Sequence, residues 1–195
     1  MTAIRLYVEG GGPGSYAKCR RAFKALFLKV VPDKEVTVIA CGARDDALSD
    51  FGLALSQRPH ENLYVLIDSE APVVDGHGPI RHLQAEGKQV RGAQEAQVHL
   101  MVECMEAWFL ADRSCLRTYY GNRLDEGALP GNPNIEAVNK TEVLRGLARA
   151  ARNTPKKRYD KGRDSFELLS RIDPSTLRRA AAHAERLFAA AEQDP

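Results

Sequence analysis

The sequence predicts an α/β sandwich in which helices cover both faces of a mostly parallel sheet and a helical appendage follows at the C-terminus. Two observations support this fold class. Short apolar runs typical of buried strands alternate with helix-periodic segments through residues 1–120, and residues 121–195 carry helical patterns only. We therefore expect an α/β domain over residues 1–120 and a helical appendage over residues 121–195 that packs on it.

The first two strand-helix units are predicted from apolar runs that change into helical periodicity. The apolar run of residues 4–8 is closed by Glu9 and followed by a glycine-rich turn, after which residues 15–30 place their large apolar side chains on one helix face. Residues 35–40 are rich in β-branched side chains, and residues 45–56 return to helical spacing. The chain therefore begins with strand, helix, strand and helix.

A third strand, residues 63–68, is predicted to run into a loop at residues 71–78, whose glycines and prolines exclude regular structure. Residues 79–87 predict a short helix and residues 98–102 a fourth strand, which leads into the apolar stretch of residues 105–111. The loop is expected to lie over the end of the third strand.

The C-terminal third is predicted to hold about three helices, from the spacing of helix start and stop signals. A loop rich in Gly, Pro and Asn covers residues 121–134. Asn139 to Glu142 resembles a capping box before residues 143–151, and Asp173-Pro174 marks a stop and a restart.

The composition indicates a globular protein of the cytoplasm. With 44% hydrophobic and 28% charged residues, the chain can bury a core. The formal net charge is only +2, so attraction to nucleic acid would have to come from a local patch. The four cysteines lack the spacing of a zinc site or a disulfide framework, which suits reduced thiols. No signal peptide and no apolar stretch of about 20 residues is present, so no membrane association is expected.

Three carboxylates follow two predicted strand ends. Glu9 closes the first strand, while Asp68 and Glu70 close the third and lie two residues apart, on one side of an extended chain. Open parallel sheets carry their active sites at these ends. Carboxylates, water and substrate phosphate are the ligands that Mg²⁺ favours, so we expect a site for Mg²⁺ or Mn²⁺.

The glycine turn after Glu9 is a candidate phosphate contact. Gly10 and Gly11 precede a helix, where free backbone N–H groups can meet a phosphate. The turn lacks the Gly-Lys-Ser/Thr ending of a P-loop. A plain connector between strand and helix is the alternative interpretation.

Further site residues are expected at Glu106 and in a basic segment. Glu106 follows a strand within an apolar stretch, where an unpaired charge is costly, and is a candidate metal ligand; a helix N-terminal charge is the alternative. Lys161 and Arg163 belong to a basic cluster around Tyr159 that offers donors for phosphate, or else a solvated loop.

A strand ending in Glu-Gly, followed by a strand ending in Asp-x-acid, resembles the Toprim domain of primases, topoisomerases and overcoming-lysogenization-defect nucleases. The resemblance implies a three-layer sandwich in which Glu9 is a general acid or base and Asp68 with Glu70 binds Mg²⁺. The usual motif has Asp where this chain has Glu70.

A second resemblance covers nearly the whole chain. Val8-Glu9-Gly10, Leu66-Ile67-Asp68, the run from His99 to Asp112 with its Met-Glu-Ala-Trp core, and Lys161-Gly162-Arg163 are similar to the bacterial Toprim-like family known as domain of unknown function 4276. Its members are often found beside an ATPase in phage-defence gene pairs, which implies an ATPase partner.

These observations predict an Mg²⁺- or Mn²⁺-dependent nuclease, or a related phosphoryl-transfer enzyme, that acts on DNA or RNA. Asp68, Glu70 and Glu106 would hold the metal, Glu9 and Lys161 would act in catalysis, and Gly10, Gly11 and Arg163 would contact phosphate. One alternative is a non-catalytic regulatory partner of an ATPase, and another is a domain that binds nucleotide phosphate without cutting polymers. A homo-oligomer is compatible with all three.

Overall fold

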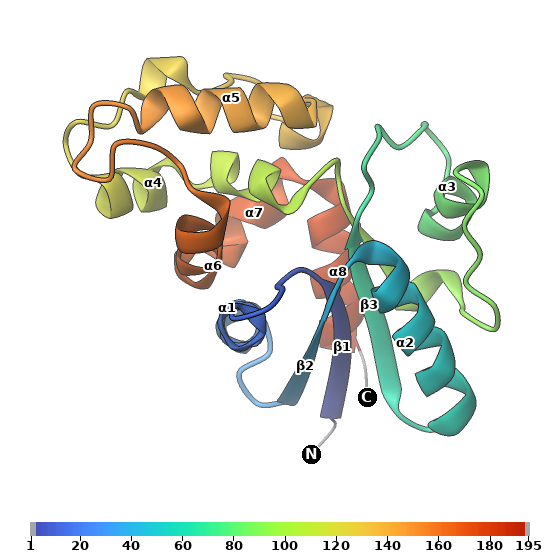
Figure 1. Cartoon of the computed structure of the whole chain (residues 1–195). Coiled ribbons are helices and arrows are strands. Elements are labelled where there is room, and N and C mark those ends of the chain that lie inside the picture. The colour runs from blue at the N-terminus through green and yellow to red at the C-terminus, as the bar shows by residue number, and fades with distance from the viewer. Residues whose placement is uncertain (1–2, 194–195) are drawn as a thin grey trace.

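Four parallel strands form one sheet in the computed structural model, which describes residues 3–193. The strands are β1 (Ala3–Glu9), β2 (Glu35–Gly42), β3 (Asn62–Asp68) and β4 (Val98–Met101). Their spatial order is β2-β1-β3-β4, and every neighbouring pair is parallel (Figure 1). The predicted strands and the largely parallel sheet are confirmed.

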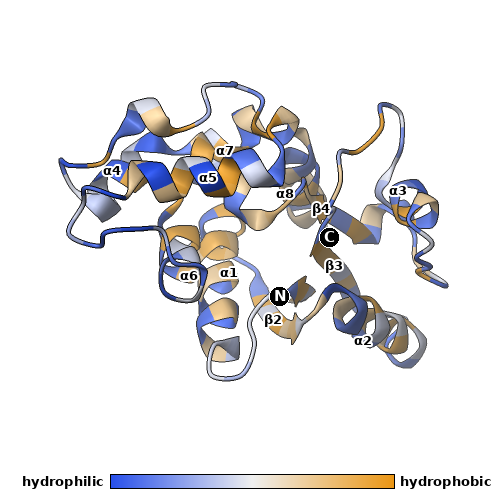
Figure 2. Cartoon of the chain, turned by 45° about the horizontal axis from the view of Figure 1, so that its top comes forward, coloured by the Kyte–Doolittle hydropathy of each residue, from blue (hydrophilic) through white to orange (hydrophobic). Residues whose placement is uncertain are grey.

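Helices cover both faces of this sheet and make a three-layer sandwich (Figure 1). The α-helices of the described range are α1 (Tyr16–Val30), α2 (Arg44–Gln57), α3 (Pro79–Ala85), α4 (Arg113–Tyr120), α5 (Lys140–Ala150), α6 (Lys161–Arg171), α7 (Pro174–Ala180) and α8 (Ala182–Gln193). Side chains alternate between the faces of a strand. Tyr7 and Val65 therefore pack against α2, whereas Leu6 and Val8 pack towards α1 and the C-terminal helices. The strand ribbons in Figure 2 carry apolar colour interrupted by polar positions, whereas the loop between α5 and α6 is mostly polar.

The apolar stretch Met105–Ala111, for which no helix or strand was predicted, forms a 3₁₀ helix whose residues are almost all buried. One expectation for the C-terminal helices is wrong. Four helices, α5 to α8, follow residue 121 in the described range, where about three were expected. The additional break falls at Ala181, whose φ of −142° and ψ of 107° are extended.

The sequence around Ala181 contains no Gly or Pro that would predict the break between α7 and α8. The residue that caps the start of α8 is distant in sequence. The carboxylate of Glu136 accepts hydrogen bonds from the backbone N–H of His183 at 2.9 Å and from its Nδ1 at 3.0 Å. A helix start satisfied by a tertiary contact leaves no local signal.

The strand order creates a crevice between β1 and β3. From β1 the chain crosses through α1 to β2 on one side, and from β3 it continues to β4 on the other side. Ligands of open α/β sheets bind at such a switch point, outside the carboxyl ends of the strands. Glu9 and Asp68 are the last residues of β1 and β3 and face this crevice.

The C-terminal helices share a core with the sheet. α6 packs along α1, and α8 packs against β4. Lys29 of α1 donates to the carbonyl oxygens of Ser170 and Ile172, at the C-terminal end of α6, at 2.8 and 2.9 Å. α6 is thereby held beside the strand ends. In the described range, no helix has both the length and the apolar character needed to cross a bilayer.

Candidate metal centre

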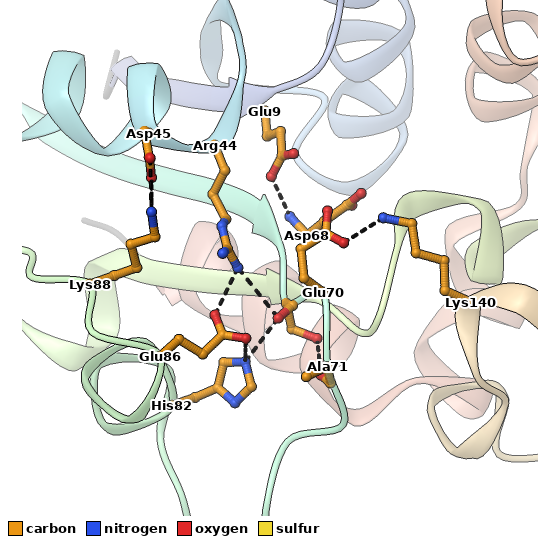
Figure 3. Close-up of polar contacts among 11 residues, drawn as sticks. Glu9, Arg44, Asp45, Asp68, Glu70, Ala71, His82, Glu86, Lys88 and Lys140 are labelled. Atoms are coloured by element: carbon orange, nitrogen blue, oxygen red, sulfur yellow. Dashed lines mark hydrogen bonds and ion pairs between the residues drawn. The ribbon is translucent and has the colours of Figure 1, made fainter.

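Glu9, Asp68 and Glu70 converge at the crevice. Each offers one carboxylate oxygen, and the three oxygens lie within 4.8 Å of one another. The backbone N–H of Asp68 donates to Oε2 of Glu9 at 3.0 Å, which ties the end of β1 to the end of β3 (Figure 3). The structure therefore brings together the three acids that the strand-end pattern predicted.

Asp68 and Glu70 meet by a route different from the predicted one. β3 ends at Asp68, and Glu70 has a φ of 60°, in the left-handed region that non-glycine residues rarely adopt. Its N–H donates to the carbonyl of Glu103 at 3.0 Å, which holds the turn in place. The convergence thus comes from a strained turn and not from alternation along an extended strand.

The other side of this turn is supported by a small polar network. Arg44 at the start of α2 pairs with Glu86 at 2.8 Å, and Nε2 of His82 lies 3.0 Å from the carbonyl oxygen of Ser69 (Figure 3). Helices α2 and α3 therefore fix the backbone that presents Glu70.

Burial dominates the electrostatics of the acids. Asp68 is 6% exposed, and burial together with the neighbouring charges of Glu9 and Glu106 raises its pKa to about 8. Burial also raises the pKa of Glu9, against the lowering effect of the N–H group of Asp68. Met105 N–H donates to Oδ1 of Asp68 at 2.9 Å, which is too little to offset the burial of the charge. The site favours either protons or a cation.

Lys140 supplies one positive charge that the sequence analysis missed. Its ammonium lies 2.6 Å from Oε2 of Glu70, and its backbone N–H donates to Glu103 at 2.8 Å (Figure 3). Burial lowers the pKa of Lys140, whereas the hydrogen bond to Glu70 and the charge of Asp68 raise it. The raising effects are larger, so the pKa of Lys140 lies above its ordinary value. The only sequence signal was its place beside the helix cap Asn139.

Glu106 lies behind the acidic group and pairs with Lys161. Its Oε1 is 3.2 Å from the ammonium of Lys161 and accepts a hydrogen bond from the hydroxyl of Tyr159 at 3.1 Å. Glu106 is fully buried, and its Oε2 has no hydrogen-bond partner in the described range. Among the described residues, the acids close enough to share an ion are Glu9, Asp68 and Glu70, so Glu106 contacts the lysine instead of joining them.

A pocket of about 230 Å³ opens beside the acids. It is lined by residues from the strand ends, the glycine turn and α6: Glu9, Gly10, Gly11, Ser15, Gly42, Asp68, Met105, Lys161, Gly162, Ser165 and Phe166. Lys161, in the first turn of α6, faces the two strand-end acids across it. The pocket therefore combines carboxylates with one cation, as a site for a metal and a phosphate requires.

The two predicted phosphate-binding glycines differ. The N–H of Gly10 already donates to the carbonyl of Gly42 at 2.9 Å, so Gly10 lines the pocket without a free donor. No acceptor for the N–H of Gly11 is found in the described part of the chain. A side chain at Gly11, whose φ is 80°, would come within 3.1 Å of Tyr16, so the turn needs glycine there.

Arg163 is held away from this pocket. Its Nε and Nη2 lie 2.6 and 2.9 Å from the carboxylate of Asp164, and Nη2 also donates to the carbonyl of Arg158. It lines a neighbouring groove with Phe166 instead. Lys161 is therefore the basic residue of the predicted Lys-Gly-Arg motif that contacts the carboxylate pocket.

Comparison with known proteins gives one match. The sequence model of the family described as a domain of unknown function (DUF4276) matches residues 11–191, a range that begins just after Glu9 and Gly10. No curated protein and no solved structure matches the chain. Since the matched range covers most of the chain, the protein belongs to the DUF4276 family.

Proposed function

We propose that the protein is an Mg²⁺- or Mn²⁺-dependent nuclease, or a related phosphoryl-transfer enzyme, of the bacterial cytoplasm. One observation carries the proposal: three carboxylates with oxygens within 4.8 Å of one another lie at the switch point of a parallel sheet, beside a pocket that also contains Lys161. The resemblance of the Glu-Gly and Asp-x-acid strand ends to Toprim nucleases supports it.

The acidic group fits a small divalent cation. Ligands of an octahedral Mg²⁺ at about 2.1 Å are about 3 to 4 Å apart, so oxygens within 4.8 Å need only small side-chain movements to share one. The raised pKa of Asp68 indicates that the charge of this buried acid is incompletely compensated within the protein. Asp68 and Glu70 would hold the ion, and Glu9 would lie beside it as the acid or base. When bound, the ion would lower the pKa of water and offset charge on a phosphate.

Glu9 and Lys161 would have separate roles in the reaction. Oε2 of Glu9 is occupied by the N–H of Asp68, which leaves Oε1 to take or give a proton at the pocket. The ammonium of Lys161, held by Glu106, is placed to bind a phosphate oxygen. Arg163 and Gly10 are less suited to bind phosphate in this pocket. The guanidinium of Arg163 contacts Asp164, and the N–H of Gly10 donates to Gly42.

Cleavage assays with DNA and RNA in Mg²⁺ or Mn²⁺ test the proposal. Glu9→Gln and Asp68→Asn should each reduce cutting by at least about a hundredfold, as expected for loss of a proton-transfer group or a metal ligand. Glu35→Gln is the matched control, because Glu35 is an exposed acid at the opposite end of β2. Cutting that survives both site substitutions would rule out the assigned mechanism.

Calorimetric titration with Mn²⁺ separates metal binding from catalysis. Wild type and Glu35→Gln should bind one ion, and Asp68→Asn should bind far more weakly because a buried ligand is lost. Absence of Mn²⁺ binding to the wild type would contradict the proposal.

The contact between Lys140 and Glu70 favours a second candidate, a non-catalytic partner of an ATPase. At 2.6 Å from Glu70, the ammonium of Lys140 already neutralises part of the acidic group without a metal. No cutting of DNA or RNA, with or without an ATPase partner, would support this candidate.

A further inference from the structure

Helix α1 is strongly basic although the protein as a whole is nearly neutral. It contains five Lys and Arg residues and no acid, whereas the formal net charge of the chain is only +2. Lys29 is engaged by backbone carbonyls of Ser170 and Ile172. The other four are exposed, and no ion pair involving them is found in the described range: Lys18, Arg20, Arg21 and Lys24.

Two of these side chains line a groove between α1 and α6. This groove, of about 270 Å³, is formed by Lys18, Arg21 and two alanines of α1 and by Arg163, Phe166, Glu167 and Ser170 of α6. Its one acid, Glu167, lies 3.3 Å from Arg171. Three basic side chains and one acid therefore line the groove, which gives it a net positive charge.

Arg163 is positioned for a phosphate contact in this groove. Asp164 holds one edge of its guanidinium, and no partner for Nη1 is found among the described residues. A guanidinium fixed on one edge keeps its remaining donors in a set direction. The free edge of Arg163 therefore lies at the groove and outside the carboxylate pocket.

Phe166 joins the groove to the candidate metal centre. It lines both the α1–α6 groove and the pocket of Glu9 and Asp68, and its ring approaches Gly10. The ring is partly exposed on one turn of α6. An aromatic face between a basic groove and a catalytic pocket is the arrangement with which proteins stack a nucleic-acid base.

We propose that the groove between α1 and α6 binds the sugar-phosphate backbone of a single-stranded nucleic acid, with a base stacked on Phe166 and the strand continuing into the carboxylate pocket. The inference rests on the proposed function and names the substrate class of that site. Lys18, Arg21 and Arg163 would contact phosphates, and Lys161 would receive the phosphate at the metal.

The position of Phe166 favours a single strand over a duplex. A base reaches an aromatic ring only when it is unstacked, which costs least in a single strand.

Fluorescence anisotropy with a short labelled oligonucleotide in EDTA tests the groove without cutting. Lys18→Glu with Arg21→Glu should weaken binding at least about tenfold, whereas Arg20→Glu with Lys24→Glu, an equal charge change on the same helix outside the groove, should weaken it much less. Equal losses for the two pairs would show that only the general charge of α1 matters and would overturn the proposal.

Phe166→Leu tests the stacking contact with little change in volume. It should weaken single-strand binding about fivefold or more while the thermal unfolding midpoint stays close to that of the wild type. The affinities of the wild type for single-stranded DNA and RNA of one sequence, and for the corresponding duplexes, identify the substrate. Tighter binding of a duplex than of either single strand would overturn the proposal, and so would an unchanged affinity in Phe166→Leu.

The two proposals fail in different ways. Loss of binding by the Lys18 and Arg21 variant, with no cutting by the wild type in Mg²⁺ or Mn²⁺, would support the groove and reject the nuclease. Cutting by the wild type, with full single-strand binding by that variant, would reject the groove and leave the nuclease in place.

Discussion

Two buried aspartates of this protein have opposite electrostatic environments. Asp164 is 0% exposed, and its oxygens lie within hydrogen-bonding distance of Arg163, the hydroxyls of Tyr119 and Tyr120, and a backbone N–H. Burial raises its pKa, but these hydrogen bonds, with Arg163 first, lower it more, so the pKa of Asp164 lies below its ordinary value. Asp68, 6% exposed, has its pKa raised to about 8.

The two carboxylates differ in their partners, and burial acts against both of them. Asp68 accepts one N–H group from Met105 and has acidic neighbours in Glu9 and Glu106. Asp164 anchors the first turn of α6, and its charge is satisfied by the protein itself. The carboxylate of Asp68 lacks a full set of donors within the protein, a condition that is frequent among acids of functional sites.

The largest expected effect on the free energy of unfolding comes from removing the charge of Asp164. Asp164→Asn should lower the free energy of unfolding by about 3 kcal/mol, because one amide oxygen replaces two carboxylate oxygens that accept from Arg163, two tyrosine hydroxyls and a backbone N–H. Asp68→Asn should leave that free energy unchanged or raise it, since a charge without a full set of donors is removed. Urea denaturation in EDTA measures both. Similar losses for the two variants would contradict the comparison.

The pH dependence of stability should separate the two aspartates next. The folded pKa of Asp68, about 8, is above its ordinary value of 3.8, so the native state binds the extra proton between these pH values. Stability from Asp68 is therefore present at low pH and lost as the pH rises from about 4 to about 8. Asp164, with its lowered pKa, has the opposite sign: its contribution is present above the ordinary pKa and lost as the pH falls.

Urea denaturation in EDTA at about pH 5 and about pH 8 tests this sign. The wild type should lose on the order of 2 kcal/mol more than Asp68→Asn between these pH values. Added Mn²⁺ should reduce the difference, because a bound cation replaces the proton. If the free energy of unfolding changes by the same amount in the wild type and in Asp68→Asn between these pH values, Asp68 is ionised throughout the interval.

The sequence predicted the elements whose signals are local. Strand ends at Glu9 and Asp68 follow from apolar runs, and the convergence of their side chains follows from a parallel sheet. The start of α8 was missed because its cap, Glu136, is distant in sequence. Lys140 was missed for the same reason, since only the tertiary fold brings α5 to the turn at Glu70.

The groove between α1 and α6 was not predicted from the sequence, for a different reason. Attraction to nucleic acid was expected to need a local patch, and the absence of acids from α1 was readable in the sequence. What could not be read was that α6 would lie along α1 and join its lysine and arginine side chains to Arg163 and Phe166. Arg163 was predicted to contact phosphate because it belongs to the same basic cluster as Lys161, but residues two apart on a helix point in different directions.

The smallest expected effect concerns backbone strain at the metal centre. Glu70 and Lys157 are the non-glycine residues of the described range with positive φ, 60° and 66°. Glycine removes the steric cost of that conformation, so Lys157→Gly should raise the free energy of unfolding by about 0.5 to 1 kcal/mol. Glu70→Gly should gain less, because it also loses the ion pair with Lys140, worth up to about 1 kcal/mol for a partly exposed pair. Calorimetry should then show weaker Mn²⁺ binding for Glu70→Gly alone, and equal Mn²⁺ affinity in the two variants would mean that the strained turn presents no metal ligand.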